Sequence, residues 1–69
     1  MIPWSILEKL KGELIRLYIS DLPDPHCVLF GKIEEVGEHI VLFKDEDHEQ
    51  LIYIPVKKII MIKKAGTSK

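Results

Sequence analysis

The residues best suited to metal or nucleophilic chemistry are three histidines and one cysteine. His26 and Cys27 are adjacent, whereas His39 and His48 stand further along the chain. Zinc sites need three or four converging ligands, and neither CxxC nor HxxxH spacing occurs here. A nucleophilic cysteine needs a base and an orienting group within hydrogen-bond reach, and no nucleophile motif surrounds Cys27. We therefore expect no metal, no cofactor, no small-molecule substrate and no enzymatic activity.

Charge is unevenly distributed along the chain. Acidic residues crowd the middle, most densely at 45–49 (Asp-Glu-Asp-His-Glu), and every charged residue after Glu49 is a lysine. The acidic run lacks the glycine and the spaced ligands of an EF-hand loop, which favours a solvated hairpin tip over a calcium site. Two interpretations of the charge asymmetry remain open. One is ordinary solvated loops, and the other is acid-to-base complementarity between neighbouring subunits.

Three residues could bind a nucleic acid on the protein surface. Arg16 and Lys32 supply positive charge, and Tyr18 supplies a ring on which a base could stack. The formal net charge of -1 gives no general attraction to phosphate backbones. Any nucleic-acid binding must therefore come from such a local site.

A short helix is predicted at the start of the chain. Residues 5–8 (Ser-Ile-Leu-Glu) have the form of a capping box, in which the serine side chain accepts a first-turn amide hydrogen bond. Ile6, Leu7 and Leu10 would lie on one face, and Gly12 would end the helix in the left-handed conformation. So short a helix must pack on an apolar surface, with Trp4 anchoring its entrance.

Alternating polarity predicts a half-buried strand after the helix. From Glu13 onward, Ile15, Leu17 and Ile19 fall on one side, while Arg16, Tyr18 and Ser20 fall on the other. Residues 21–25 (Asp-Leu-Pro-Asp-Pro) end this strand in an exposed loop, because proline cannot donate to a sheet ladder.

The next two strands form a predicted hairpin. In the second strand, Cys27 to Val36, the apolar residues change phase, which implies a bulge or sharp bend with Gly31 as the natural pivot. Residues 36–39 form a tight connection, 40–43 a third strand, and 44–50 a polar tip.

Two further strands, 51–54 and 59–62, are joined by a single turn at 55–58 and followed by a tail, 63–69, that is expected to be disordered. Both faces of these strands are apolar, which is more than a 69-residue monomer could cover. We therefore expect them to form the contact between subunits, through Leu51, Ile52, Tyr53, Ile54, Ile59, Ile60, Met61 and Ile62.

Length and hydropathy bound the remaining possibilities. Residues 1–69 make one domain whose private core is marginal, and a single cysteine cannot supply an internal disulfide, so assembly into a homo-oligomer is expected. No apolar run approaches the ~20 residues of a membrane span, and the N-terminus lacks the pattern of a signal peptide. These features predict a cytoplasmic protein that does not enter membranes.

The order of elements resembles the Sm-like family, including its bacterial Hfq branch, over residues 3–62. Residues 3–7 (Pro-Trp-Ser-Ile-Leu) are similar to the family's helix entry, 30–42 (Phe-Gly-Lys-Ile-Glu-Glu-Val-Gly-Glu-His-Ile-Val-Leu) to its first motif, and 53–62 (Tyr-Ile-Pro-Val-Lys-Lys-Ile-Ile-Met-Ile) to its second. The resemblance implies a mainly β fold: a five-stranded, strongly bent, SH3-like barrel with a short N-terminal helix. It also implies a ring in which the fourth strand of one subunit pairs with the fifth of the next, and RNA contacts on a pore-facing rim.

The sequence departs from the family where RNA would be read. Gly37 and Val41 replace the aspartate and asparagine of the first motif, and Ile54-Pro55 replaces the Arg-Gly or Lys-His pair of the second. Base selection needs hydrogen bonds to base edges, so the family's uridine pocket is not expected here. The leading hypothesis is a ring-forming binding module that binds RNA in a non-standard way. The alternative is a protein-interaction or scaffolding barrel with no role in nucleic-acid binding.

Overall fold

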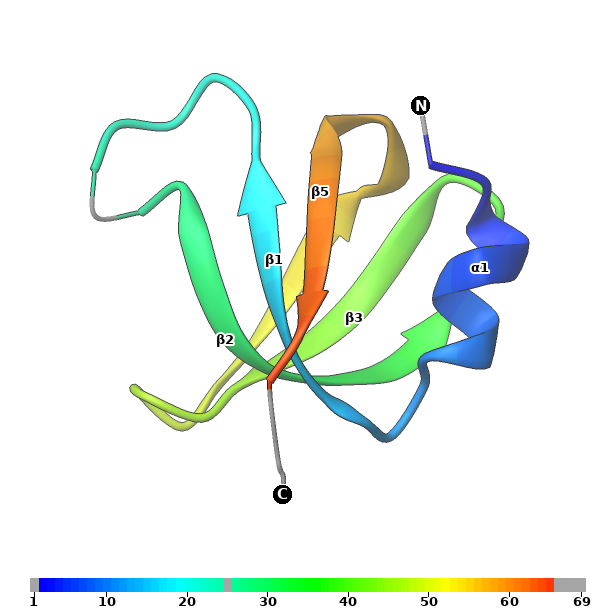
Figure 1. Cartoon of the computed structure of the whole chain (residues 1–69), viewed down its shortest axis with the longest axis horizontal. Coiled ribbons are helices and arrows are strands. Elements are labelled where there is room, and N and C mark those ends of the chain that lie inside the picture. Colours follow the sequence, from blue (N-terminus) through cyan, green and yellow to red (C-terminus); the bar gives the residue numbers. More distant parts are fainter. Residues whose placement is uncertain (1, 25, 66–69) are drawn as a thin grey trace.

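A computed structural model describes residues 2–24 and 26–65 (Figure 1). In chain order its elements are α1 (Trp4–Lys9), β1 (Leu14–Ile19), β2 (Val28–Val36), β3 (Ile40–Asp45), β4 (Gln50–Pro55), a 3-10 turn η1 (Val56–Lys58) and β5 (Ile59–Lys64). The strands form one antiparallel sheet in the order β4-β3-β2-β1-β5. The prediction of a mainly β chain with a short N-terminal helix is confirmed.

Burial along β1 follows the predicted alternation. Ile15, Leu17 and Ile19 are buried, whereas Arg16 is exposed and Tyr18 is half-buried. Successive side chains of a strand point to opposite faces, so the sequence pattern assigns one face to the core and the other to the outer surface. This outer face carries the polar residues considered below.

The helix begins two residues earlier than the capping box predicts. Pro3 is the N-cap, without a side-chain hydrogen bond, and its carbonyl accepts the amide of Ile6 at 3.0 Å. Ser5 therefore already lies inside the first turn, where its hydroxyl does not cap. The predicted capping box is wrong because proline, which fixes its own φ and needs no amide partner, starts the helix instead.

At the far end the helix stops at Lys9 with Leu10 as its C-cap, before the predicted Gly12, although Gly12 has the predicted backbone conformation. Gly12 adopts a positive φ of 84°, as a left-handed stop requires, and its amide donates to the carbonyl of Ile33 at 3.0 Å. Of the predicted apolar face, Leu7 is fully buried and Leu10 is half-buried, but Ile6 remains exposed. A helix of six residues covers only a narrow stripe of the sheet.

The sheet bends sharply at β2. Its register with β3 shifts between Ile33 and Glu35, which makes Glu34 the extra residue of a bulge. Gly31 is where two backbones come closest, because a Cβ added there would lie 1.9 Å from the carbonyl oxygen of Lys44. The predicted bulge is confirmed, but it lies three residues beyond the glycine that was expected to form it.

The last strands are longer than predicted, and β5 includes Lys63 and Lys64. The prediction that these two lysines belong to a disordered tail is wrong, because residues 61–64 pair with β1. Residues 66–69 of that predicted tail lie outside the described part of the chain, as does Pro25 of the predicted loop. Between β4 and β5, η1 is held by a hydrogen bond from the amide of Val56 to the carbonyl of His39 at 2.9 Å.

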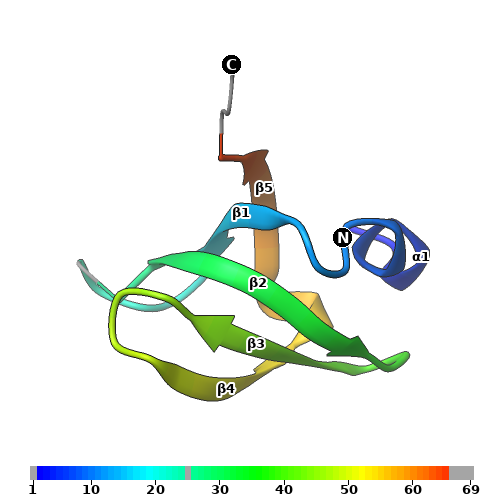
Figure 2. The same cartoon turned by 90° about the horizontal axis from the view of Figure 1, so that it is seen from below.

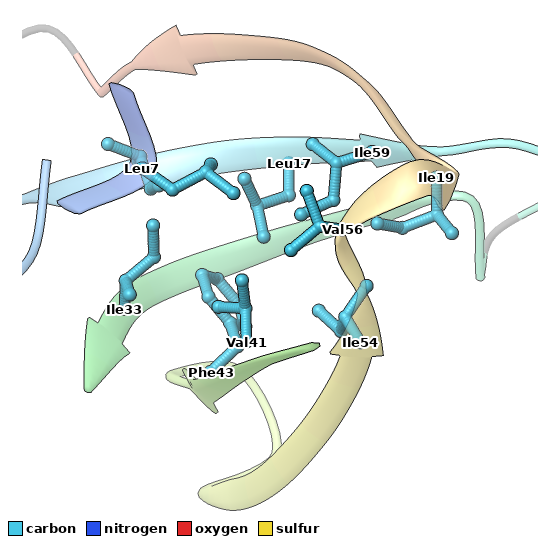
Figure 3. Packing of buried hydrophobic residues seen from close by; sticks show 10 residues of the cluster. Leu7, Leu17, Ile19, Ile33, Val41, Phe43, Ile54, Val56 and Ile59 are labelled. Atoms are coloured by element: carbon cyan, nitrogen blue, oxygen red, sulfur yellow. The ribbon is translucent and has the colours of Figure 1, made fainter. Parts of the chain in front are cut away.

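The buried core lies inside the bend of the sheet. Figure 3 shows side chains from α1, the strands and η1 pointing toward one another, with Phe43 the largest fully buried one. The sheet does not close around this core, because no ladder joins β4 to β5 in residues 2–24 and 26–65. The predicted barrel is therefore an open, strongly bent sheet within one chain, and β4 and β5 form its two edges (Figure 2).

Candidate functional site

The two edge strands carry exposed apolar side chains. On β4, Leu51 and Tyr53 are 62% and 69% exposed, and on β5, Ile60 and Met61 are 61% and 42% exposed. A strand edge with unpaired amides and carbonyls is already a template for pairing with another strand. These four residues make both edges apolar as well as unpaired, as the predicted subunit contact requires.

Other residues of the predicted contact belong to the chain's own core. Ile54 and Ile59 are only 3% and 1% exposed, so their side chains are not available to a partner. Leu51 and Tyr53 stay exposed on one face, as expected of a monomer that cannot cover both faces of these strands, and the chain covers only the other face. The bend of the sheet folds that face over the core, where a chain of this length can bury it.

Two residues of the predicted contact lie between these extremes. Ile52 of β4 and Ile62 of β5 are half-buried and pack against the core from its opposite edges. Each points to the concave side of the sheet, because Ile52 pairs with the buried Phe43 and Ile62 with the buried Leu17. The core is thus incompletely covered at both edges.

The outer face of β1 brings together cationic and aromatic side chains. Arg16 has Phe30 of β2 and Lys63 of β5 as its two neighbours across the sheet. Its guanidinium lies 5.4 Å from the centroid of the Phe30 ring, and the ammonium of Lys63 lies 5.5 Å from that of Tyr18. These distances are within the range of cation–π attraction. Arg16 and Tyr18 were predicted for this surface, whereas Phe30 and Lys63 were not.

Lys32, the third predicted nucleic-acid contact, lies on the same outer face but in another row. It is exposed, and its neighbours across the sheet are Leu14 and Lys44. Phe30 could have been found from the sequence, since it is in phase with Lys32 on one strand. Lys63 could not have been found while it was assigned to the tail.

A cleft of about 520 Å³ opens between the β3–β4 hairpin and the start of β2, where His26, Val28 and Leu29 line it. Asp45, only 3% exposed, lies in its lining. One oxygen of its carboxylate accepts the backbone amide of Asp47 at 2.9 Å, and the other lies 2.9 Å from Nδ1 of His48. The hairpin tip was predicted to be fully solvated, and for Asp45 this is wrong. Its carboxylate turns inward to order the hairpin.

The Asp45–His48 pair shifts the pKa of both groups. Burial opposes ionisation of Asp45, but the hydrogen bonds from His48 and from the Asp47 amide outweigh it, so the pKa of Asp45 is lowered. The hydrogen bond to Asp45 and its charge raise the pKa of His48. The pair is therefore held together most firmly when Asp45 is ionised and His48 is protonated.

The Cys27 thiol is held in its protonated form. It is half-buried and donates a hydrogen bond to a carboxylate oxygen of Asp24 at 2.9 Å. This bond and partial desolvation raise the pKa of Cys27. Within residues 2–24 and 26–65, no group of three histidine, cysteine or acidic side chains is placed to hold a metal ion. In the same part of the chain, no helix has the length and apolarity needed to cross a membrane.

The positions that the Sm-like resemblance links to base recognition are Gly37, Val41, Ile54 and Pro55, none of which has a polar side chain. Val41 is fully buried, Ile54 is buried beside it across the β3–β4 ladder, and Gly37 lies in the β2–β3 connection. Side-chain polar atoms that could hydrogen-bond to a base edge are therefore lacking at these positions.

Comparisons with protein-family models, curated proteins and solved structures gave no significant match to this chain.

Proposed function

We propose that this chain is a non-enzymatic, Sm-like binding module that assembles with copies of itself into a closed ring. The observation that carries the proposal is the pair of unpaired sheet edges, β4 and β5, each with exposed apolar side chains. A head-to-tail contact between two different edges can close on itself by rotation, and closure leaves no strand edge exposed.

The arrangement of the two edge strands leaves both open to pairing. The η1 turn joins β4 (yellow) to β5 (orange), and β5 runs at a steep angle to β4 in Figure 2. Because β5 does not lie along β4 of its own chain, the free edge of β4 is open to the β5 of a neighbouring copy, which we place antiparallel to it. Such pairing uses perpendicular hydrogen bonds, like every other ladder of this sheet.

Matching the faces of the two strands allows only registers that differ by two residues, and pairing the two half-buried residues, Ile52 and Ile62, selects one of these. Ile52 and Ile62 both point to the core side, and Tyr53 and Met61 both point outward, so each pair would meet across the contact. The first pair would complete the core cover at both edges. Each fully covered side chain would contribute roughly 1.5–3 kcal/mol to association.

Solution mass tests the ring directly. Light scattering coupled to size exclusion at micromolar concentration should give a single mass that is a multiple of the 8.0 kDa chain. Native mass spectrometry should then give one subunit number. A monodisperse 8.0 kDa species at that concentration would refute the assembly.

Single-stranded RNA on the outer face is the candidate ligand of this module. The supporting observation is the grouping of Arg16, Tyr18, Phe30 and Lys63 on one face, with cationic groups near aromatic rings. Bases stack on such rings regardless of sequence, while the cations contact phosphates. This mode would be non-standard for an Sm-like protein, because it does not use the apolar positions Val41 and Ile54.

RNA titrations over a range of salt separate this candidate from a scaffolding barrel. Binding of single-stranded RNA to the outer face should weaken steeply as salt rises and should not favour uridine. Arg16→Ala should weaken it, whereas Lys11→Ala, which removes an exposed cation near the helix, should not. If no RNA binds at low salt, the RNA-binding candidate is refuted and the scaffolding function remains. Tight, uridine-selective binding would contradict the statement that the apolar positions Val41 and Ile54 cannot recognise a base.

A further inference from the structure

The two edges differ in charge at one end. Asp47 and Glu49 are exposed at the hairpin tip that leads into β4, and Lys63 and Lys64 are exposed at the end of β5. Lys64 also lies 3.3 Å from an exposed carboxylate oxygen of Glu13 in the same chain. Both partners of that pair are largely solvated, so the pair contributes little and leaves the ammonium free to take a second partner.

Antiparallel pairing would bring these opposite charges together. In the register that places Ile52 beside Ile62, Gln50 of β4 lies opposite Lys64 of the neighbouring copy. Glu49, one residue earlier, then falls opposite Ala65 of that copy, one position beyond Lys64 and two beyond Lys63. Within its own chain, Lys63 pairs with Arg16 of β1. No acidic side chain of the same chain therefore lies opposite Lys63 in the β1–β5 ladder.

We infer that the β3–β4 hairpin tip and the β5 terminus form a charge-complementary clasp between neighbouring copies, which makes ring assembly dependent on salt. This inference rests on the proposed β4–β5 contact and adds its electrostatic determinants. Apolar pairing alone would tolerate a shift along the edges, whereas the clasp fixes the acidic end of one edge to the basic end of the next. Raising NaCl from about 0.05 to 0.5 M should therefore weaken association, because exposed charge pairs are screened.

Reciprocal charge reversal tests the clasp. One variant carries Asp47→Lys and Glu49→Lys, and the other carries Lys63→Glu and Lys64→Glu. Alone, each variant presents like charges at both sides of its contact, and each should bind itself about tenfold more weakly or stay monomeric. Mixed in equal amounts, the two variants should assemble again, since every contact then joins opposite charges. Native mass spectrometry should show alternating assemblies with an even number of subunits.

Matched variants control for net charge. Glu8→Lys with Glu34→Lys, and Lys9→Glu with Lys11→Glu, cause the same changes of net charge at exposed positions away from both edges. Each of these should assemble alone like the wild type. Circular dichroism should confirm that all variants are folded. If one does not fold, Glu49→Gln and Lys63→Gln should each give a smaller loss of association in the same direction.

The outcomes separate this inference from the ring itself. A wild-type chain that assembles while both reversed variants also assemble alone would overturn the clasp and leave the ring standing. Reversed variants that stay monomeric after mixing would overturn it as well. A wild-type monomer would refute the ring and the clasp together.

Discussion

The central strands β1–β3 and the edge strands β4 and β5 are similarly rich in apolar residues, but they use them differently. Phe43 on β3 is fully buried, whereas Tyr53 on the adjacent β4 is mostly exposed. The two lie next to each other in the sheet, on opposite faces, because the ladder pairs Phe43 with Ile52. The comparison teaches that apolar content does not define the core of this protein. The core is defined by the concave face, and the most exposed of the large apolar side chains, Leu51, Tyr53 and Ile60, lie on the edge strands.

Truncating the central aromatic should break this comparison most strongly. Phe43→Ala leaves a cavity in the middle of the core and should lower the free energy of unfolding by about 3–5 kcal/mol. Tyr53→Ala should leave the circular dichroism spectrum unchanged and weaken assembly instead. Urea unfolding and light scattering on both variants provide the two measurements. Equal loss of folding stability in the two variants would mean that edge and core are not distinct.

Gly31→Ala probes the bend that separates the two regions. The added methyl group would lie 1.9 Å from the carbonyl oxygen of Lys44, so the backbone must move, at a cost of about 2–3 kcal/mol. Gly37→Ala is the control, because its nearest backbone atom would be 3.2 Å away and the expected loss is under about 1 kcal/mol. Thermal unfolding of both variants measures the difference. Similar melting temperatures would show that the approach at Gly31 is easily relaxed.

A charge on the β5 edge should affect assembly and not folding. Ile60 is already exposed, so Ile60→Asp should fold but lose the subunit contact, since an unpaired carboxylate cannot be buried there. Ile52→Asp should give monomer or aggregate, because Ile52 also packs on the core. Glu46→Lys should assemble normally, because the amide of Glu46 pairs with Phe30, on the side of the tip away from the β4 edge. Retained assembly of Ile60→Asp in light scattering would argue against β5 as the contact.

The smallest expected effect is a pH dependence of the hairpin tip. The pKa of His48 is raised in the folded chain, so its contribution to stability is present below about pH 6.5 and is lost as pH rises through the folded value. The pKa of Asp45 is lowered, so its contribution is present above about pH 3.8 and is lost as pH falls below that. The pair should therefore stabilise the fold most between these limits.

Comparing the wild type with His48→Gln isolates this effect from the other titrating groups. The difference in melting temperature between the two proteins should be larger at pH 5.5 than at pH 8. His26→Gln provides the matched control, because His26 lines the same cleft. A difference that grows toward pH 8 would contradict the assigned direction of the His48 pKa shift.

Local patterns in the sequence were enough to predict most elements of the fold. Alternation in β1, the positive φ at Gly12 and the phase change in β2 each depend on neighbouring residues, and all three are confirmed. The start of the helix was mispredicted because Pro3 and Ser5 compete for the same role, and the sequence does not rank them. The bulge was expected at Gly31 because a glycine allows it, but Gly31 serves the close backbone approach instead.

The candidate site was only partly predictable. Arg16, Tyr18 and Lys32 lie on one outer face as expected, because alternation in a strand assigns faces. Phe30 is in phase with Lys32 on β2 and could have been assigned to this face, whereas Lys63 joins it only through the pairing of β5 with β1, two strands far apart in the chain. Asp45 points inward because it is in phase with Val41 and Phe43 on β3, and this was missed because the third strand was expected to end at residue 43.

Local patterns in the sequence were enough to place the helix and strands approximately and to show that 51–54 and 59–62 are apolar throughout. Which of these apolar side chains are buried in the chain's own core became clear from the tertiary structure alone. Ile54 and Ile59 enter the core, whereas Tyr53 and Ile60 stay exposed at the edges. The physical reason is that periodicity is a local property, while burial depends on the curvature of the whole sheet and on which strands remain unpaired. The curvature covers the concave face, and the order β4-β3-β2-β1-β5 leaves two apolar edges open.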